Sequence, residues 1–420
     1  MKVCIVTPGQ LGSNPRVVKE ASALAGAGHE VTVVATKVAD FVEPRDRSIL
    51  ATAPFAVRRV PFGAGPGWVA ARLFQMVARA VCKLAMREPF ASWALSPMSA
   101  GLAKAAMRIG ADLYIAHYPP ALAAAARAAK RHSSVYGYDA EDFHLGDLPT
   151  GPEHDFDRAL IRSVESSWLA GAVSVTAAAP LIAEAYAESY AIAVPNFIPN
   201  AFPREGGAKC ASLAGVARPG PSLYWFSQVI GPNRGIETAV RAIARTRQPI
   251  QLYLRGTPAA GYLRELKALA MAVGVEDRVH TCDPLPPADL ERDGARYDLG
   301  YIGETGHTVN RDIALTNKLF SYLSSGLAIV GSRISAHAGM AAELGLAIRL
   351  FTPDNEISLA EAIDGFFSSP ECLAAARGEA WKLGHDDWSW EAHAPRLVAL
   401  LERAAGAQDL RATRLEAVPV

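Results

Sequence analysis

The chain has 420 residues, of which 50% are hydrophobic, enough for more than one core because single domains rarely exceed ~250–300 residues. Its 42 basic residues balance its 42 acidic ones, which argues against a nucleic-acid-binding protein, since such proteins carry a basic excess. Five widely spaced cysteines without a Cys-x-x-Cys pair, a short apolar N-terminal run and the lack of a spanning helix predict a soluble, cytoplasmic protein without a disulfide framework or structural zinc.

The first 36 residues predict one βαβ unit. Residues 2–7 form an apolar run typical of a buried strand, and a glycine-containing loop follows at residues 9–13. Asn14 is a good N-cap and Pro15 suits the first helical turn, so a helix is expected from there to residue 25. Residues 29–35 then form a second strand, which implies a parallel sheet.

The same alternation of strands and helices continues along the chain. A stretch rich in Pro, Gly and Asn near residues 196–221 interrupts it, and the alternation then restarts. Before this stretch we expect strands at 112–116, 133–138 and 173–176, with helices at 120–130, 155–169 and 179–190. After it we expect strands at 223–226, 250–254, 279–282, 298–302, 327–331 and 348–351, with helices at 236–244, 262–273, 317–325, 336–344, 357–367 and 390–404. The sequence therefore predicts two doubly wound α/β domains in tandem, with ligands at the carboxyl ends of the strands, in a cleft between the domains.

The second domain contains two loops suited to an anion. Residues 231–235 connect a strand to a helix, where backbone N–H groups bind phosphate and Arg234 adds a fixed positive charge. Lys318 lies in the first turn of another helix, where a cation opposes the helix dipole unless an anion is bound. Each residue could instead be an ordinary solvated cation. The long polar loop 304–312 precedes Lys318 and is a further candidate for ligand contact.

In the first domain, polar residues follow two neighbouring strands. His117 comes after one, and Asp139, Glu141, Asp142 and His144 come after the next, at the edge expected to face the cleft. A lone histidine here is more often structural. The acidic triplet at 139–141 is a weak match to a metal-binding motif. The loop 9–13 lacks the third glycine of a dinucleotide fingerprint, which counts against a hydride-transfer enzyme.

Four parts of the sequence, at residues 13–21 with 28–33, 230–235, 317–323 with 326–330, and 388–391, follow one another in an order that covers nearly the whole chain. Together they resemble bacterial glycosyltransferases of family 4. The resemblance implies a GT-B fold of two facing Rossmann-like domains, a nucleotide-sugar donor and transfer with retention of configuration. The expected parts are an acceptor-side domain at 1–200, a linker at 201–221, a donor domain at 222–388, a C-terminal helix at 389–405 that packs back on the first domain, and a loose tail at 406–420.

The resemblance also implies roles for individual residues. Arg234 and Lys318 would neutralise the leaving diphosphate, so that no metal is needed. Acceptor-side chemistry would fall among His117, Asp139, Glu141 and Asp142. The residues implied in donor binding are Gly12, Ser13, Gly231, Arg234, Asn310, Asp312, Thr316, Asn317, Lys318 and Ser321.

The sequence departs from the family at a pair of glutamates spaced eight apart. The first would stand near Ile313, where Asp312 or Asn310 could substitute, and the second at Ser321. Many members also have a histidine in place of Glu141. The expected function is transfer of a sugar to a glycan or lipid-linked acceptor in envelope polysaccharide or glycolipid synthesis. The alternatives are a nucleotide-sugar epimerase of the same architecture and a non-catalytic sugar-nucleotide-binding protein.

Residues 68–87 predict a basic amphipathic helix. They contain Arg72, Arg79, Lys83 and Arg87 and no acidic residue. Such a helix can lie flat on an anionic membrane, as a lipid-linked acceptor would require. The alternative expectation is that its apolar side packs on the N-terminal sheet and its cations are merely solvated, as in most soluble proteins.

Overall fold

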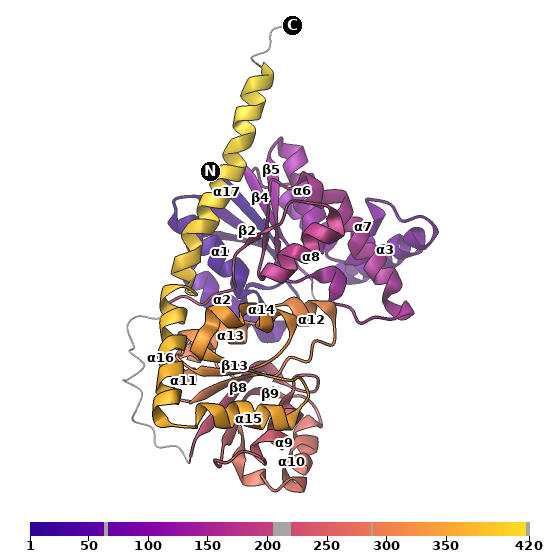
Figure 1. The fold of residues 1–420 in the computed structure, drawn as a ribbon. Helices are drawn as coiled ribbons and strands as arrows, with labels where there is room; N and C mark the ends of the chain where they lie inside the picture. Colours follow the sequence, from indigo (N-terminus) through magenta and orange to yellow (C-terminus); the bar gives the residue numbers. More distant parts are fainter. Residues whose placement is uncertain (63–65, 205–219, 287–288, 417–420) are drawn as a thin grey trace. The chain divides into compact units, whose positions relative to one another are not determined.

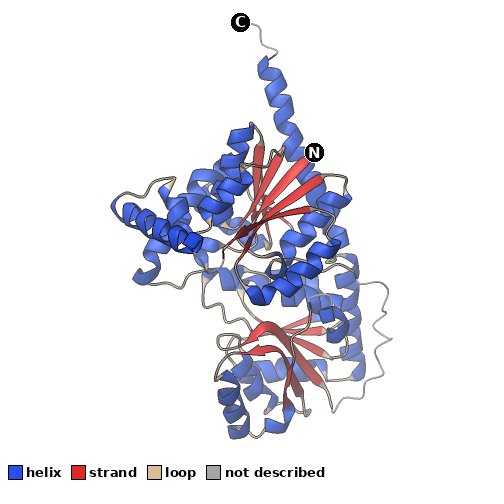
Figure 2. Ribbon diagram, turned by 180° about the vertical axis from the view of Figure 1, so that it is seen from behind, coloured by secondary structure: helices blue, strands red, loops and turns tan. Residues whose placement is uncertain are grey.

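The structure, a computed structural model, describes residues 1–62, 66–204, 220–286 and 289–416 (Figure 1). Most of the predicted linker at 201–221 lies outside these residues. The chain divides into two compact units, one formed by Met1–Ile198 with Ala394–Val420 and the other by Pro199–His393. Each unit is an α/β domain with helices around one parallel sheet (Figure 2).

The first unit is built on a seven-stranded sheet in the order β3-β2-β1-β4-β5-β6-β7. Its strands are β1 (Lys2–Val6), β2 (Glu30–Lys37), β3 (Ala56–Pro61), β4 (Leu113–His117), β5 (Val135–Ala140), β6 (Ser174–Ala177) and β7 (Asn196–Phe197). Its helices are α1 (Pro15–Gly26), α2 (Glu43–Thr52), α3 (Pro66–Leu84), α4 (Phe90–Leu95), α5 (Ser99–Ala106), α6 (Pro119–His132), α7 (Asp155–Trp168) and α8 (Pro180–Tyr190).

The second unit is built on a six-stranded sheet in the order β10-β9-β8-β11-β12-β13. Its strands are β8 (Ser222–Ile230), β9 (Gln251–Pro258), β10 (Val279–Cys282), β11 (Leu299–Ile302), β12 (Ala328–Ser332) and β13 (Ile348–Phe351). Its helices are α9 (Ile236–Ile243), α10 (Tyr262–Ala272), α11 (Leu290–Gly294), α12 (Val309–Ile313), α13 (Asn317–Ser324), α14 (Ser335–Leu344), α15 (Glu356–Phe366) and α16 (Pro370–Asp386). The last helix, α17 (Trp390–Glu416), begins in this unit and continues in the first.

Both sheets have the doubly wound order expected from the sequence. In each sheet, the first three strands are added one after another toward one edge, and the later strands are added toward the other edge. The direction of strand addition therefore reverses between β1 and β4 and between β8 and β11. All pairings between these strands are parallel. The central strands are buried, and β4, β11 and β12 have no exposed residue. Ligands bind such sheets beside the carboxyl ends of the strands at this reversal.

Several elements differ from those predicted. The structure adds α2, β3, α4 and α5 between the first βαβ unit and β4, and α16 before the last helix. The predicted polar loop 304–312 contains the start of the short helix α12. The predicted loose tail is wrong as far as residue 416, because α17 continues to Glu416 instead of ending near residue 404. Residues 417–420 lie outside the described part of the chain.

Candidate functional site

In the second unit, the loop from Gly231 to Gly235 connects β8 to α9 at the sheet reversal. Two of its residues have left-handed backbones, Asn233 with φ 61° and Gly235 with φ 68°. A Cβ on Gly235 would lie 2.4 Å from the carbonyl oxygen of Gly303. The Tyr301 hydroxyl also donates to the carbonyl of Gly235 at 2.7 Å. The loop is therefore held directly against the end of β11, with Arg234 half-buried beside it.

Glu304 is the centre of the charged groups at the end of β11. Its side chain is buried, and its Oε1 accepts a hydrogen bond from Nζ of Lys318 at 3.0 Å. A guanidinium nitrogen of Arg311 lies 4.0 Å from Oε2. Burial acts to raise the pKa of Glu304, but the charge and hydrogen bond of Lys318 and the charges of Arg311 and Arg234 outweigh it and lower the pKa to about 2. Glu304 is therefore ionised at neutral pH.

A hollow of about 200 Å³ opens at this cluster. It is lined by Pro232, Asn233, Arg234, Glu304, His307 and Arg311. Lys318 lies behind Glu304, with Nζ 5.7 Å from the ring centre of Trp225. Arg234, Arg311 and Lys318 thus lie around one carboxylate next to the N-terminus of α9. Such a cationic hollow beside backbone N–H groups is suited to a phosphate or diphosphate.

The other residues implied in donor binding are less closely grouped. Gly231 and Asn310 are buried, and Asp312 accepts hydrogen bonds from the backbone and hydroxyl of Ser335. Asn317 accepts from Asn200 at 2.9 Å, and Ser321 is buried within α13. The Thr316 hydroxyl lies at the start of α13, and its oxygen is buried without a hydrogen-bond partner in the described structure. The structure therefore brings Arg234 and Lys318 together around Glu304, while Asp312 and Ser321 do not line the hollow.

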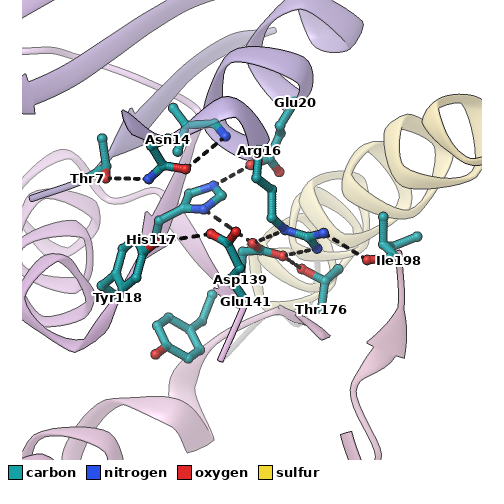
Figure 3. A network of polar contacts seen from close by, with 12 residues as sticks. Thr7, Asn14, Arg16, Glu20, His117, Tyr118, Asp139, Glu141, Thr176 and Ile198 are labelled. Atoms are coloured by element: carbon teal, nitrogen blue, oxygen red, sulfur yellow. Dashed lines mark hydrogen bonds and ion pairs between the residues drawn. The ribbon is translucent and has the colours of Figure 1, made fainter. Parts of the chain in front are cut away.

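In the first unit, a buried network joins α1 to the ends of β4 and β5 (Figure 3). Arg16 donates two hydrogen bonds to the carboxylate of Asp139, at 2.6 and 2.7 Å, and a third to the carbonyl of Ile198. His117 lies between two carboxylates, with Nε2 2.5 Å from Glu20 and Nδ1 3.2 Å from Asp139. All four of these side chains are buried.

The opposite charges in this network stabilise one another's ionised forms. Burial acts to raise the pKa of Asp139, but Arg16 and His117 outweigh it and lower the pKa to about 2. Burial acts to lower the pKa of His117, but the charges of Asp139 and Glu20 outweigh it and raise the pKa. The structure therefore shows His117 and Asp139 engaged with protein groups instead of pointing into solvent.

The remaining predicted residues of this unit lie around the network. Glu141 and Asp142 are half-buried, and Glu141 accepts a hydrogen bond from the Tyr118 hydroxyl at 3.1 Å. The backbone of Tyr118 has φ 68°, an uncommon value for a residue other than glycine. Gly12 donates its backbone N–H to Asp46 at 2.8 Å, and the Ser13 hydroxyl donates to the carbonyl of Gln10.

Three residues of these clusters were not singled out from the sequence. Arg16 and Glu20 lie four apart on one face of a predicted helix, a spacing that places them on the same side. Glu304 comes two residues after a predicted strand, in a loop already considered for ligand contact. In the described part of the chain, no three His, Cys, Asp or Glu side chains gather as metal ligands. A metal-independent reaction stays a prediction.

The comparisons with known proteins agree with this architecture. Residues 12–201 match the family model described as a glycosyl transferase 4-like domain. None of the curated protein sequences compared is significantly similar to the chain.

Solved structures match both units over nearly their full length. HepE of Anabaena, solved with UDP and glucose, is 16% identical and has a TM-score of 0.70, with 96% of this chain and 99% of that one covered. Sucrose-phosphate synthase of Thermosynechococcus elongatus is 15% identical with a TM-score of 0.70, covering 97% and 100%. WaaG, a glycosyltransferase involved in lipopolysaccharide biosynthesis, is 14% identical with a TM-score of 0.58, covering 96% and 98%. The predicted GT-B fold and the resemblance to glycosyltransferases are confirmed.

Proposed function

We propose that this chain, a GT-B protein whose residues 12–201 match a glycosyl transferase 4-like domain, transfers a sugar from a nucleotide-sugar donor to an acceptor. The observation that carries the proposal is the cationic hollow of the second unit. It is lined by Arg234 and Arg311, backed by Lys318, and adjacent to the N-terminus of α9. A diphosphate carries the charge and the oxygen acceptors that these donors require.

The donor is proposed to be a nucleoside diphosphate sugar, with uridine as the first base to test because HepE was solved with UDP and with UDP-glucose. Arg234 and Lys318 would hold the diphosphate and stabilise the negative charge that develops as the sugar–phosphate bond breaks. Fixed donors of this kind usually supply the largest catalytic contribution. No metal is required in this scheme, since the side chains and the helix N-terminus supply the positive charge.

The transfer is proposed to retain the configuration of the donor sugar, with the donor phosphate taking the proton of the acceptor hydroxyl. A strong protein base is then unnecessary. Glu141 and Asp142, which are half-buried, are the better candidates to contact the acceptor. His117 and Asp139 are buried in ion pairs and would act by fixing the end of the sheet on which Glu141 lies.

The acceptor is proposed to be a glycan or a lipid-linked sugar of the cell envelope, with the enzyme working in the cytoplasm at the inner face of the membrane. A lipid-linked acceptor carries its sugar hydroxyl close to a lipid surface. No helix in the described part of the chain is long and apolar enough to cross a membrane.

The test is release of nucleoside diphosphate from a panel of nucleotide-sugars, with and without a mixture of lipid-linked and free glycan acceptors. A transferase releases nucleoside diphosphate at a rate that depends on the acceptor. Conversion of the donor sugar without acceptor would instead show an epimerase, and binding without turnover in any combination would show a non-catalytic protein. Analysis of the anomeric centre of the product decides between retention and inversion.

A further inference from the structure

Helix α3 exposes most of its large apolar side chains. The exposed fractions are 91% for Leu84, 65% for Met76, 61% for Val77, 57% for Leu73 and 50% for Val69. Trp68 and Phe74 of the same helix are exposed as well. Isolated exposed apolar residues are ordinary, but a contiguous group on one helix indicates an interaction surface.

The fully buried residues of α3 are small or polar instead. Ala78 and Cys82 are buried in a cluster with residues of α4, α6 and α7. Gln75 is buried and donates to the carbonyl of Ala94 at 3.1 Å. This cluster contains no residue of the sheet, and Figure 1 shows α3 at the periphery of the first unit, beside α7. The expectation that the apolar side packs on the sheet is therefore wrong.

The exposed residues form one continuous stripe. Positions 69, 73, 76, 77, 80 and 84 recur at helical spacing, and all of them are exposed. The cations Arg72, Arg79 and Lys83 lie along one flank of this stripe, since each precedes a stripe residue by one position. Arg72 and Lys83 are exposed, and so is Arg87 just beyond the helix. Arg79 is half-buried and pairs with Asp157 at 2.8 Å.

We propose that α3 is the surface through which this protein binds an anionic lipid bilayer, with the helix lying in the plane of the headgroups. The stripe is defined as Val69, Leu73, Met76, Val77, Ala80 and Leu84, and the basic flank as Arg72, Lys83 and Arg87. The stripe enters the boundary of the acyl chains while the long cationic side chains reach the phosphates beside it. Helix α3 has no acidic residue, so nothing on it opposes a negatively charged surface.

The charges also argue against a second copy as the occupant. Two protomers meeting through the same stripe would bring two basic flanks together, with no acidic residue on either helix to offset them. A bilayer supplies both the apolar layer and the negative charge. This inference rests on α3 alone and does not depend on the proposed transferase activity.

The experiment is flotation of the full chain with vesicles of phosphatidylcholine alone and of phosphatidylcholine mixed with phosphatidylglycerol, at low and high salt. Wild type is expected to float with the anionic vesicles at low salt, and less at high salt because salt screens the charges. One variant changes the stripe (Leu73→Gln with Val77→Gln), and another changes the basic flank (Arg72→Gln, Lys83→Gln and Arg87→Gln). Each is expected to bind at least about tenfold more weakly.

Matched controls come from the second unit. Arg247→Gln with Arg264→Gln and Lys267→Gln removes three exposed cations, and Met271→Gln removes an exposed apolar side chain. Both controls should float like wild type. All variants should keep the wild-type melting temperature, because the altered side chains are exposed.

Three results would overturn the proposal. They are equal binding to neutral and anionic vesicles, flotation of the two α3 variants like wild type, and failure of wild type to float at all. A dimer in sedimentation velocity that the stripe variant disperses, together with no flotation, would assign the stripe to a second copy instead. Donor turnover is measured separately, so a failed transferase assay leaves these outcomes readable.

Discussion

Glu304 places a negative charge among the cations that are proposed to hold the donor diphosphate. Its carboxylate neutralises Lys318 at 3.0 Å when no ligand is bound, and an entering diphosphate must compete with it. Glu304 thus stabilises the empty cluster while weakening the attraction for an anion. A buried carboxylate in this position is a charge that ligand binding has to overcome.

The variant Glu304→Gln should therefore bind nucleoside diphosphate and inorganic pyrophosphate more tightly, by roughly tenfold. The same change should lower the melting temperature, because Lys318 loses its buried counterion. Calorimetric titration measures the first effect and a thermal melt the second. Glu343→Gln, an exposed change on α14, serves as the control. Weaker binding of pyrophosphate by Glu304→Gln would show that Glu304 positions Lys318 for the ligand and does not compete with it.

His117 predicts a pH dependence of stability. Its pKa is raised in the folded protein because, against the effect of burial, Asp139 and Glu20 stabilise the imidazolium, while Arg16 partly opposes them. The stabilisation is complete below the unfolded pKa of about 6.5 and is lost as pH rises through the higher folded pKa. The melting temperature of wild type should exceed that of His117→Asn most below pH 6.5, and the difference should shrink toward alkaline pH. A difference that grows with pH would contradict a charged His117.

Among the elements, the β8–α9 loop has strict backbone requirements. Gly235 has φ 68° and no room for a side chain, since a Cβ would lie 2.4 Å from the Gly303 carbonyl oxygen. The close approach of this loop to β11 is what places Arg234 beside Glu304. Changing the glycine should therefore disturb the proposed donor site together with the fold.

Gly235→Ala is expected to lower the free energy of unfolding by about 1–3 kcal/mol through backbone strain. It should also weaken the binding of nucleoside diphosphate. Gly339→Ala is the matched control, because this glycine lies exposed within α14 with nothing within 4 Å of its Cβ position. The control should be stabilised by roughly 0.5–1 kcal/mol with no change in binding. Urea unfolding and calorimetry measure the two effects. If the two variants had equal stability and equal affinity for nucleoside diphosphate, the β8–α9 loop would not shape the proposed donor site.

The elements that could be predicted are those whose own residues carry the signal. The strands β1 and β4 are apolar runs, and α1 has an N-cap and apolar residues at helical spacing. Helix α2 was missed because its sequence, EPRDRSILAT, is largely polar and has no apolar stripe. Strand β3 was missed because it contains two adjacent arginines at the edge of the sheet, where charged side chains are tolerated.

In the candidate site too, local sequence patterns identify some residues and not others. The sequence places Arg234 and Lys318 near the starts of predicted helices, because the local pattern of strand, loop and helix residues shows where each helix begins. The Arg16–Asp139 pair joins residues 123 positions apart, and no local pattern specifies which buried charge meets which. The exposure of the α3 stripe was likewise not predictable, since periodicity identifies an apolar side without saying whether the protein covers it.

At the level of the whole molecule, the two units have similar strand orders but contain different clusters of charged residues. The second unit contains the cationic hollow, and the first contains the buried network together with α3. In the proposed function, one unit binds the donor and the other presents the acceptor near a lipid surface. Every later step of the proposed reaction depends on binding of the donor.

The most direct test is calorimetric titration of uridine diphosphate, then of the other nucleoside diphosphates, into wild type, Arg234→Ala, Lys318→Ala and the control Arg247→Ala. Arg247 is an exposed cation of the same unit that lies outside the hollow. We expect wild type and the control to bind one of these nucleotides alike, and each site variant to bind it at least about tenfold more weakly, a loss of about 1.4 kcal/mol or more. Binding by both site variants as tight as that of wild type, or no binding of any nucleoside diphosphate by wild type, would contradict this expectation.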